Sequence, residues 1–354
     1  MAAYSRIITT ENLLPTLEEE LEQVSFSSLH VVTDRNVAQS VLPMIEPSLR
    51  KRNAKTIVLE GGEEHKDLQV LSGIWEALSN SGATRSSLIL NLGGGVITDI
   101  GGFAAATFKR GIRYINIPTT VLGTVDASVG GKTAIDFNGL KNEIGAFHNP
   151  LKVIISPQPL LSLPERETLS GFAEIVKISL ISSVEFYNRA LVSDPVSDPE
   201  RLFSLIEEAV RFKERVTNQD PTEKGLRKIL NFGHTAGHAF ETWMLRRGTP
   251  ITHGEAVAHG ILVAIILSHL HAGLPSDQIY LYTQNILKQY YHPLPIECKD
   301  YDVLLEIMAH DKKNRISGEI LFVLLQAIGT PLPDQPVSPT DLRTALDIYR
   351  DLTC

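Results

Sequence analysis

Two hydrophobic patterns alternate along the first half of the chain. Short apolar runs rich in Val, Ile and Leu predict strands, and most are followed by glycine, aspartate or a helical segment. Between two of these runs, residues 66–79 carry apolar side chains at helical spacing. The alternation of strand, glycine-rich turn and helix predicts a mainly parallel α/β sheet. The predicted strands are residues 29–33, 56–59, 87–92, 114–117 and 153–155.

The pattern changes after about residue 160. Helical periodicity dominates, as in residues 201–216 and 254–271, and Pro164 before Glu165 suits the first turn of a helix. We therefore expect a Rossmann-like α/β domain over residues 1–160 and an all-α domain over residues 161–354. The apolar run 319–327 is either a short strand or a buried helix, and residues 330–340 are expected to form a surface loop.

Composition narrows the class of protein. The 354 residues are 43% apolar, which supports packed cores and excludes a disordered chain. A net charge of −8 argues against nucleic-acid binding. There are two cysteines outside any CxxC pattern, no secretory signal, and no uninterrupted apolar stretch of about 18 residues. The expectation is a cytoplasmic protein that neither spans nor binds a membrane.

A glycine-rich turn follows the third predicted strand, at Gly93, Gly94 and Gly95. Glycines there allow a pyrophosphate to approach backbone N–H groups at a helix N-terminus, although three glycines also suit a plain tight turn. After the first strand, Asp34 and Asn36 are candidates for ribose or adenine contacts, or simply for helix caps. Likewise, Glu63 and Lys66 fit either a cofactor site or an i,i+3 ion pair.

Two lysines lie in a polar, glycine-rich centre. Lys132 and Lys141 are both expected on glycine-flanked loops, where an ammonium group can bind a phosphate or carboxylate. Residues 130–133 resemble the end of a Walker A loop. That interpretation fails because Ala127 stands where the loop needs glycine.

Histidines and acids form a metal-ligand pattern in the second half. His234 and His238 lie one helical turn apart, His253 begins another helical stretch, and Glu174 lies one turn before Lys177. One carboxylate and two imidazoles make an open catalytic Zn²⁺ site. From this chemistry alone, both His234 and His238 are candidate ligands.

Eight motifs together resemble one family, the 3-dehydroquinate synthases. They occur in that family's order, and the resemblance runs from about residue 30 to 325. The motifs are GGGVITD, IPTT, VDASVGGKTA, KNEIGAF, AEIVK, RKILNFGHTAGH, HGEAVA and DKKN.

The resemblance implies an NAD-binding α/β domain, a helical metal domain, an active site between them, and a homodimer. It implies that Glu174, His234 and His253 bind Zn²⁺, a site that also accepts Co²⁺, and that His238 faces the substrate instead. The implied substrate contacts are Asp126, Lys132, Lys141, Asn142, Lys177, Arg227, Asn231, His238 and Lys312, with Lys313 as the alternative to Lys312. Arg110 is implied to contact phosphate across the dimer. NAD is implied to bind Asp34, Asn36, Glu63, Lys66, Gly94, Gly95, Asp99, Thr119 and Thr120, next to Lys132 and Lys141.

The implied reaction converts a small sugar-acid phosphate, 3-deoxy-D-arabino-heptulosonate 7-phosphate, into 3-dehydroquinate and phosphate, a step of the shikimate pathway. It runs by transient oxidation, phosphate elimination, reduction, ring opening and aldol closure. One rival is a sister cyclase acting on sedoheptulose 7-phosphate, which has no carboxylate for Arg227. A second rival is a metal-dependent polyol dehydrogenase, which has no phosphate for Lys132 or Lys141. A third is a non-enzymatic binding module. Glu255 is expected to support the metal site or the start of its helix.

Overall fold

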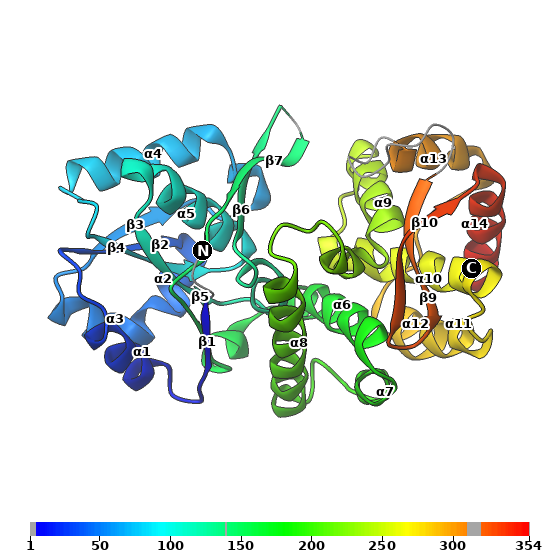
Figure 1. Cartoon of the computed structure of the whole chain (residues 1–354), viewed down its shortest axis with the longest axis horizontal. Helices are drawn as coiled ribbons and strands as arrows, with labels where there is room; N and C mark the ends of the chain where they lie inside the picture. The colour runs from blue at the N-terminus through cyan, green and yellow to red at the C-terminus, as the bar shows by residue number, and fades with distance from the viewer. Residues whose placement is uncertain (1–4, 139, 310–319, 354) are drawn as a thin grey trace. The chain divides into compact units, whose positions relative to one another are not determined.

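A computed structural model describes residues 5–138, 140–309 and 320–353 of the chain (Figure 1). The chain divides into two compact units, Met1–Pro164 and Glu165–Cys354. The division lies four residues beyond the expected boundary near residue 160. Lys312 and Lys313, implied to contact substrate, lie outside the described residues.

The first unit is built on a six-stranded sheet whose strand order is β1-β8-β5-β4-β2-β3. All of its pairings are parallel. This confirms the α/β class, and it adds an edge strand, β1, that the hydrophobic pattern did not predict. The strands are β1 (Arg6–Thr9), β2 (Leu29–Asp34), β3 (Lys55–Leu59), β4 (Leu88–Gly93), β5 (Arg113–Pro118) and β8 (Lys152–Ile155).

Helices cover both faces of the sheet because successive strand residues point to opposite sides. On β4, Leu88 and Leu90 join the core cluster that contains Leu17 and Ile45 of the helices on one face. Ile89 belongs instead to the cluster under the helices on the other face. The first face is covered by α1 (Leu13–Glu22) and α3 (Leu42–Lys51), and the second by α4 (Leu68–Asn80) and α5 (Gly95–Thr107). The short helix α2 (Arg35–Ser40) follows β2.

The lysine- and glycine-rich centre forms a hairpin where loops were expected. Its antiparallel strands are β6 (Lys132–Phe137) and β7 (Leu140–Phe147). Lys132 begins β6 and Lys141 lies in β7, so the loop prediction was wrong for both lysines. The reason is cross-strand pairing between β6 and β7, which the polar, glycine-rich sequence does not reveal. Alternate residues of β6, Thr133 and Ile135, point to the same side and are buried.

The second unit is mostly helical, as expected. Its longest helices are α6 (Glu165–Ser182), α8 (Pro199–Gln219) and α10 (His253–Ala272). By length and composition α10 would suit a membrane span, but 72% of its most apolar window is buried inside the unit, as in the core helix of a soluble protein. The other helices are α7 (Val184–Leu191), α9 (His234–Arg246), α11 (Asp277–Tyr282), α12 (Lys288–Tyr290), α13 (Tyr301–Ala309) and α14 (Pro339–Thr353).

One antiparallel strand pair departs from the all-α expectation. The ambiguous apolar run is the strand β9 (Ile320–Ala327), and the expected surface loop is its partner β10 (Thr330–Val337). Three prolines made β10 look like a loop. An edge strand tolerates proline because, at positions that face solvent, the strand needs no backbone N–H to donate to a partner strand.

Candidate active site

The sheet of the first unit has a point where its strand order reverses. From β2 the chain continues to β3 on one side, but β4 lies on the other side of β2 and is followed there by β5 and β8. Ligands of open parallel sheets bind at the carboxyl ends of strands at such a reversal. Asp34 ends β2 and Gly93 ends the adjacent β4, so Asp34 and the glycine-rich turn lie at this point.

Packing explains two of the three glycines in the turn after β4. A Cβ on Gly93 would lie 2.5 Å from the side chain of Ile97, and one on Gly94 would lie 2.9 Å from that of Thr120. At Gly95 the nearest atom would be 3.5 Å away, so this position has room for a side chain. The turn leads directly into α5, whose N-cap residue Gly94 provides no side-chain cap. Exposed backbone N–H groups at a helix start suit an anion.

A buried hydroxyl near the turn also fits a ligand. Thr119 follows β5, and its backbone N–H donates to the Gly93 carbonyl at 3.0 Å. Its Oγ1 is buried and has no hydrogen-bond partner among the described residues. Because a buried polar group without a partner is costly, a bound ligand at this edge would satisfy it. The turn and this hydroxyl together are compatible with a dinucleotide.

Asp34 serves as a helix cap, which was one of its two predicted roles. Its Oδ1 accepts the Val37 N–H at 3.0 Å at the start of α2. Asn36 lies in that helix, and a Cβ added to Gly61 after β3 would lie 3.8 Å from its Nδ2. Capping uses one oxygen of Asp34 and leaves the other available for a ribose hydroxyl.

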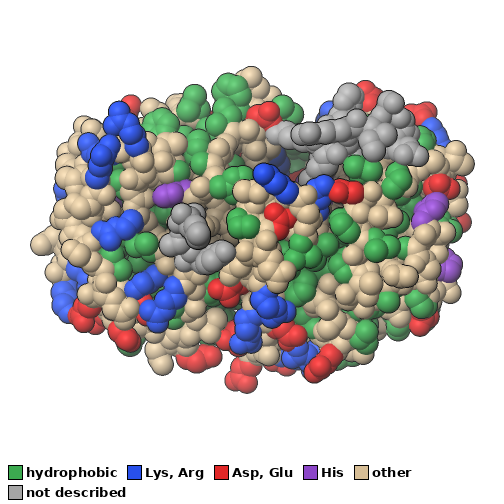
Figure 2. All heavy atoms as spheres, in the orientation of Figure 1, with side chains coloured by type: hydrophobic (Ala, Val, Ile, Leu, Met, Phe, Trp, Pro, Cys, Tyr) green, Lys and Arg blue, Asp and Glu red, His purple; other side chains and the backbone are tan. Residues whose placement is uncertain are grey.

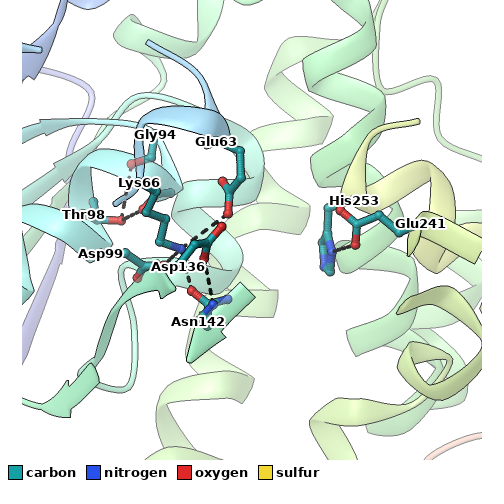
Figure 3. A network of polar contacts seen from close by, with 10 residues as sticks. Glu63, Lys66, Gly94, Thr98, Asp99, Asp136, Asn142, Glu241 and His253 are labelled. Atoms are coloured by element: carbon teal, nitrogen blue, oxygen red, sulfur yellow. Dashed lines mark hydrogen bonds and ion pairs between the residues drawn. The ribbon is translucent and has the colours of Figure 1, made fainter. Parts of the chain in front are cut away.

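Lys66 forms the i,i+3 ion pair with Glu63 that was one of the two predictions, and it is also the centre of a larger polar network (Figure 3). Its side chain is 3% exposed, and its Nζ lies 2.7 Å from Asp99 Oδ2, 2.7 Å from Asn142 Oδ1 and 3.6 Å from Glu63. Burial raises the pKa of Asp99 to about 6, although Lys66 opposes the rise. Burial alone would lower the pKa of Lys66, but Asp99 and Glu63 outweigh it and raise that pKa. One ammonium group thus joins predicted NAD and substrate residues.

Asp136 orients Asn142 within the hairpin. The backbone of Asn142 has φ 51°, a left-handed conformation, and its N–H donates to Asp136 Oδ1 at 2.7 Å. The Asp136 N–H in turn donates to the Lys66 carbonyl at 2.7 Å. Lys132 and Lys141 are exposed on the same hairpin. Asp136 was not predicted, because no motif of the sequence singles it out.

Three other predicted residues of the first unit lie in or next to short helical turns. Asp126 belongs to the π-helical turn Gly123–Ala127 after β5, and Thr120 precedes this turn, where its Oγ1 accepts the Gly123 N–H at 2.9 Å. Arg110 has φ 68° and lines a surface depression together with Lys109 and Arg85.

Three helices of the second unit bring a candidate metal-binding group together. Glu174 lies in the middle of α6, while His234 and His253 are the first residues of α9 and α10. One ligand atom from each residue lies within 4.8 Å of the others. His234 Nε2 and His253 Nε2 are each 3.5 Å from Glu174 Oε1. A buried carboxylate with two imidazoles is a donor set that Zn²⁺ takes in catalytic sites.

Glycines allow these helices to approach closely. A Cβ on Gly254 would lie 1.8 Å from the carbonyl oxygen of Ser170 on α6, and one on Gly260 would lie 2.1 Å from the Gly233 carbonyl oxygen. The Gly254 N–H also donates to Ser170 Oγ at 3.1 Å. The helix starts that carry the histidines are therefore positioned by direct backbone contact.

The charges around the group differ for its two histidines. Lys177 forms an ion pair with Glu174 inside α6, and both side chains are buried. Burial, followed by the charge of Lys177, lowers the pKa of His234 well below its ordinary value. Burial alone would also lower the pKa of His253, but the carboxylates of Glu174 and Glu241 outweigh burial and raise this pKa to about 10.

Two predicted substrate residues of this unit form hydrogen bonds with neighbouring residues. Arg227 is 3% exposed and its Nη1 donates to the Pro221 carbonyl at 2.9 Å. Asn231 donates to Glu223 at 2.7 Å. The ring of His238 lies 5.2 Å from that of His234 and 5.9 Å from that of His253, measured between centroids, but His238 is not part of the three-residue group.

Two acids near the histidines have distinct roles. Glu255 is the third residue of α10 and forms a capping box with Thr252, which resolves its role in favour of the helix start. Glu241 on α9 lies 3.5 Å from His253 Nδ1 and was not predicted. Its spacing of seven residues from His234 places both on one helix face, and that signal would have found it.

Comparisons with known proteins agree with this geometry. The family profile described as 3-dehydroquinate synthase N-terminal matches residues 56–170, and the one described as 3-dehydroquinate synthase C-terminal matches residues 171–314. A 3-dehydroquinate synthase of Parabacteroides distasonis is 45% identical over 98% of this chain and 98% of its own length. One of Leptospira interrogans is 40% identical over 94% of this chain and 92% of its own.

Solved structures show the same fold. A 2-deoxy-scyllo-inosose synthase complexed with carbaglucose-6-phosphate, NAD⁺ and Co²⁺ has a TM-score of 0.86 at 27% identity, covering 98% of this chain and 96% of its own. The ValA 2-epi-5-epi-valiolone synthase of Streptomyces hygroscopicus subsp. jinggangensis, with NAD⁺ and Zn²⁺ bound, has a TM-score of 0.83 at 24% identity. It covers 99% of this chain and 98% of its own.

Proposed function

The chain belongs to the 3-dehydroquinate synthase family, and we propose that it converts 3-deoxy-D-arabino-heptulosonate 7-phosphate into 3-dehydroquinate and phosphate. The observation that carries this conclusion is the near full-length likeness to 3-dehydroquinate synthases. The Glu174, His234 and His253 group and the glycine-rich turn are the features that such an enzyme needs for a metal and NAD.

The cofactors divide between the two units. NAD is held in Met1–Pro164 by Asp34, Asn36, Glu63, Lys66, Gly94, Gly95, Asp99, Thr119 and Thr120, with Lys132 and Lys141 beside it. Zn²⁺, or Co²⁺ in its place, is held in Glu165–Cys354 by Glu174, His234 and His253. When bound, NAD supplies a hydride acceptor and the metal supplies a Lewis acid at the substrate hydroxyls.

Positively charged residues recognise the two ends of the substrate. Arg227 pairs with the carboxylate, since a guanidinium can donate two parallel hydrogen bonds to it. Lys132, Lys312 and the partner copy's Arg110 hold the phosphate. The sugar hydroxyls and reacting carbons contact Asp126, Lys141, Asn142, Lys177, Asn231 and His238.

The reaction follows from how these groups orient the substrate. The bound sugar acid loses a hydride from a secondary alcohol, and the resulting ketone makes the neighbouring C–H acidic. Phosphate then leaves by elimination, the hydride returns to the ketone, and ring opening with aldol closure forms the carbocycle. Lys66 connects the proposed NAD residues with the proposed substrate residues, because it contacts both Asp99 of α5 and Asn142 of the hairpin.

Variants can test the division of labour between the units. Lys66→Ala should weaken NAD binding and leave zinc content unchanged, whereas His253→Ala should do the reverse. Calorimetric titration with NAD⁺ and metal analysis of the purified protein measure the two properties. If one folded variant lost both NAD⁺ binding and zinc, the assignment of the two cofactors to separate units would be wrong.

The proposed assembly is a cytoplasmic homodimer in which Arg110 acts on the partner's substrate. Exposed apolar side chains on the β6–β7 hairpin, Phe137, Leu140, Ile144 and Phe147, support a covered surface there. Figure 2 shows hydrophobic side chains at the surface in this region, while acidic and basic groups are interspersed over much of the visible face.

Mixing two inactive variants tests the dimer. Arg110→Ala and His253→Ala each disable one part of the site, so a mixed dimer regains one intact site only if Arg110 acts across the interface. Light scattering should give twice the 39.0 kDa mass of one chain. A monomer, or mixed variants without recovered activity, would contradict the assembly, and fractionation of the source cells tests the compartment.

Substrate preference separates this function from the sister cyclases and polyol dehydrogenases. We expect phosphate release from 3-deoxy-D-arabino-heptulosonate 7-phosphate, dependent on both NAD⁺ and Zn²⁺, and none from sedoheptulose 7-phosphate. Activity on sedoheptulose 7-phosphate alone would make the chain a sister cyclase and remove Arg227 from its carboxylate role. Oxidation of a simple polyol without phosphate release would make it a dehydrogenase.

A further inference from the structure

The two candidate imidazole ligands are oriented in different ways. Both present Nε2 to Glu174, as described above. The Nδ1 atom of His234 lies 3.2 Å from the backbone carbonyl of Phe232, two residues earlier in the chain. The Nδ1 atom of His253 lies 3.5 Å from the carboxylate of Glu241, which belongs to another helix (Figure 3). One histidine is therefore oriented by its own backbone and the other by a charged side chain.

The helix pair determines where Glu241 lies. On α9, His234, His238 and Glu241 follow one another at spacings of four and three residues, so they share one face. That face meets α10, against which α9 packs closely: a Cβ on Gly237 would lie 3.1 Å from the Ala256 carbonyl oxygen. Glu241 keeps a side-chain exposure of only 13% beside His253. Its carboxylate is thus held in a largely dry position at the imidazole.

The contact with Glu241 suits one tautomer of a metal-bound His253. A divalent cation on Nε2 would take the lone pair of that nitrogen, so the ring hydrogen would lie on Nδ1. A carboxylate is an acceptor only, and Glu241 is placed to accept that hydrogen. A carboxylate partner also increases the basicity of the ligating nitrogen more than a neutral carbonyl does.

We propose that Glu241 is a positioning residue of the metal site, which holds His253 in the Nδ1–H form with Nε2 directed at the bound divalent cation. This inference rests on the proposed assignment of Glu174, His234 and His253 as the metal ligands. It adds that α9 contributes twice to the site, through its own ligand His234 and through the orientation of the ligand on α10.

Metal affinity is the property that distinguishes this role from a structural ion pair. Zn²⁺ affinity is measured by competition with a chromogenic chelator, and Co²⁺ loading by the visible absorption of the bound ion. Glu241→Ala should weaken Zn²⁺ binding about 10- to 100-fold, the range seen when a hydrogen-bond partner of a ligating histidine is removed. Glu241→Gln keeps an acceptor oxygen of the same shape but loses the charge, so its loss should be smaller.

Glu255→Gln is the matched control. Glu255 also lies at the start of α10, but its carboxylate accepts the Thr252 N–H at 3.3 Å and lies 3.7 Å from Arg166. Replacing it changes one nearby charge without touching His253, so Zn²⁺ affinity should stay at the wild-type value. NAD⁺ affinity should also be unchanged in every variant, because its residues belong to the other unit.

Each outcome decides one question. Zn²⁺ binding by Glu241→Ala within about twofold of wild type would overturn the proposal, since the expected loss begins at about tenfold. An equal loss of Zn²⁺ affinity in Glu255→Gln would also overturn the proposal, because removal of any nearby negative charge would then have the same effect. If Glu241→Ala does not fold, Glu241→Gln decides: wild-type Zn²⁺ affinity in Glu241→Gln would overturn the proposal, and a measurable loss that Glu255→Gln does not share would support it. If His253→Ala binds Zn²⁺ like wild type, the ligand assignment itself fails, and that result is distinct from failure of Glu241 alone.

Discussion

Replacing Gly254 with alanine tests whether helix contact positions the candidate metal site. Gly254 follows His253 at the start of α10, and its N–H donates to Ser170 Oγ of α6 at 3.1 Å. The same helix α6 carries Glu174. Any change that separates α10 from α6 at this point therefore separates two of the three proposed ligands.

The size of the perturbation follows from the distance at Gly254. An added Cβ would lie 1.8 Å from the Ser170 carbonyl oxygen, about 1.6 Å short of the 3.4 Å at which ordinary van der Waals contact begins. The obstacle is backbone on both sides, so the helices must move apart. Metal–ligand distances tolerate only about 0.2 Å. We expect more than tenfold weaker Zn²⁺ binding by Gly254→Ala and a loss of about 1–3 kcal/mol in the free energy of unfolding.

The assay combines Zn²⁺ competition titration with thermal unfolding. Gly73→Ala is the control, because an added Cβ there meets nothing within 4 Å and lies in the middle of α4. That variant should gain about 1 kcal/mol from helix propensity and keep its Zn²⁺ affinity. NAD⁺ affinity should be normal in both variants. Wild-type Zn²⁺ affinity and unfolding temperature in Gly254→Ala would refute the argument that this helix contact positions the ligands.

Three further predictions concern buried polar groups. Burial lowers the pKa of His259 from 6.5 to about 3, so only the unfolded chain takes up this proton as the pH falls below 6.5. The free energy of unfolding should therefore drop by about 2 kcal/mol between pH 7 and pH 5. Urea titrations at the two pH values should show a smaller drop in His259→Asn. Tyr349→Phe removes the hydroxyl that lies 2.7 Å from His259 Nδ1 and should cost about 1–3 kcal/mol in the same titration. Lys66→Ala leaves Asp99 without its ion pair and should cost about 3 kcal/mol, part of which Asp99→Asn should restore in the double variant.

The sequence predicted the elements that strong hydrophobic patterns encode. The five predicted strands and the helices α8 and α10 are confirmed because their apolar residues form continuous runs or helical stripes. The edge strand β1 was missed because it is four residues long and only partly buried. The hairpin β6–β7 and the strand β10 were taken as loops, because glycines flank the lysines of the hairpin and three prolines lie in β10. Only the partner strands reveal the pairing.

Residue contacts at the candidate site were less predictable than its location. The spacing of Glu63 and Lys66 suggested an ion pair, but the contact of Lys66 with Asn142 joins residues 76 positions apart. No local pattern encodes such a contact. Histidine chemistry alone also left His234 and His238 as equal candidates, and only the approach of α9, α10 and α6 groups His234 with His253 and Glu174.

The most direct test of the proposed function follows phosphate and NADH together in one reaction. Purified protein loaded with Zn²⁺ is given 3-deoxy-D-arabino-heptulosonate 7-phosphate and a much smaller amount of NAD⁺. The account predicts phosphate release in large excess over NAD⁺ without accumulation of NADH, because the hydride returns to the substrate in each turnover. Accumulation of NADH without phosphate release would contradict it and identify the reaction as a simple dehydrogenation.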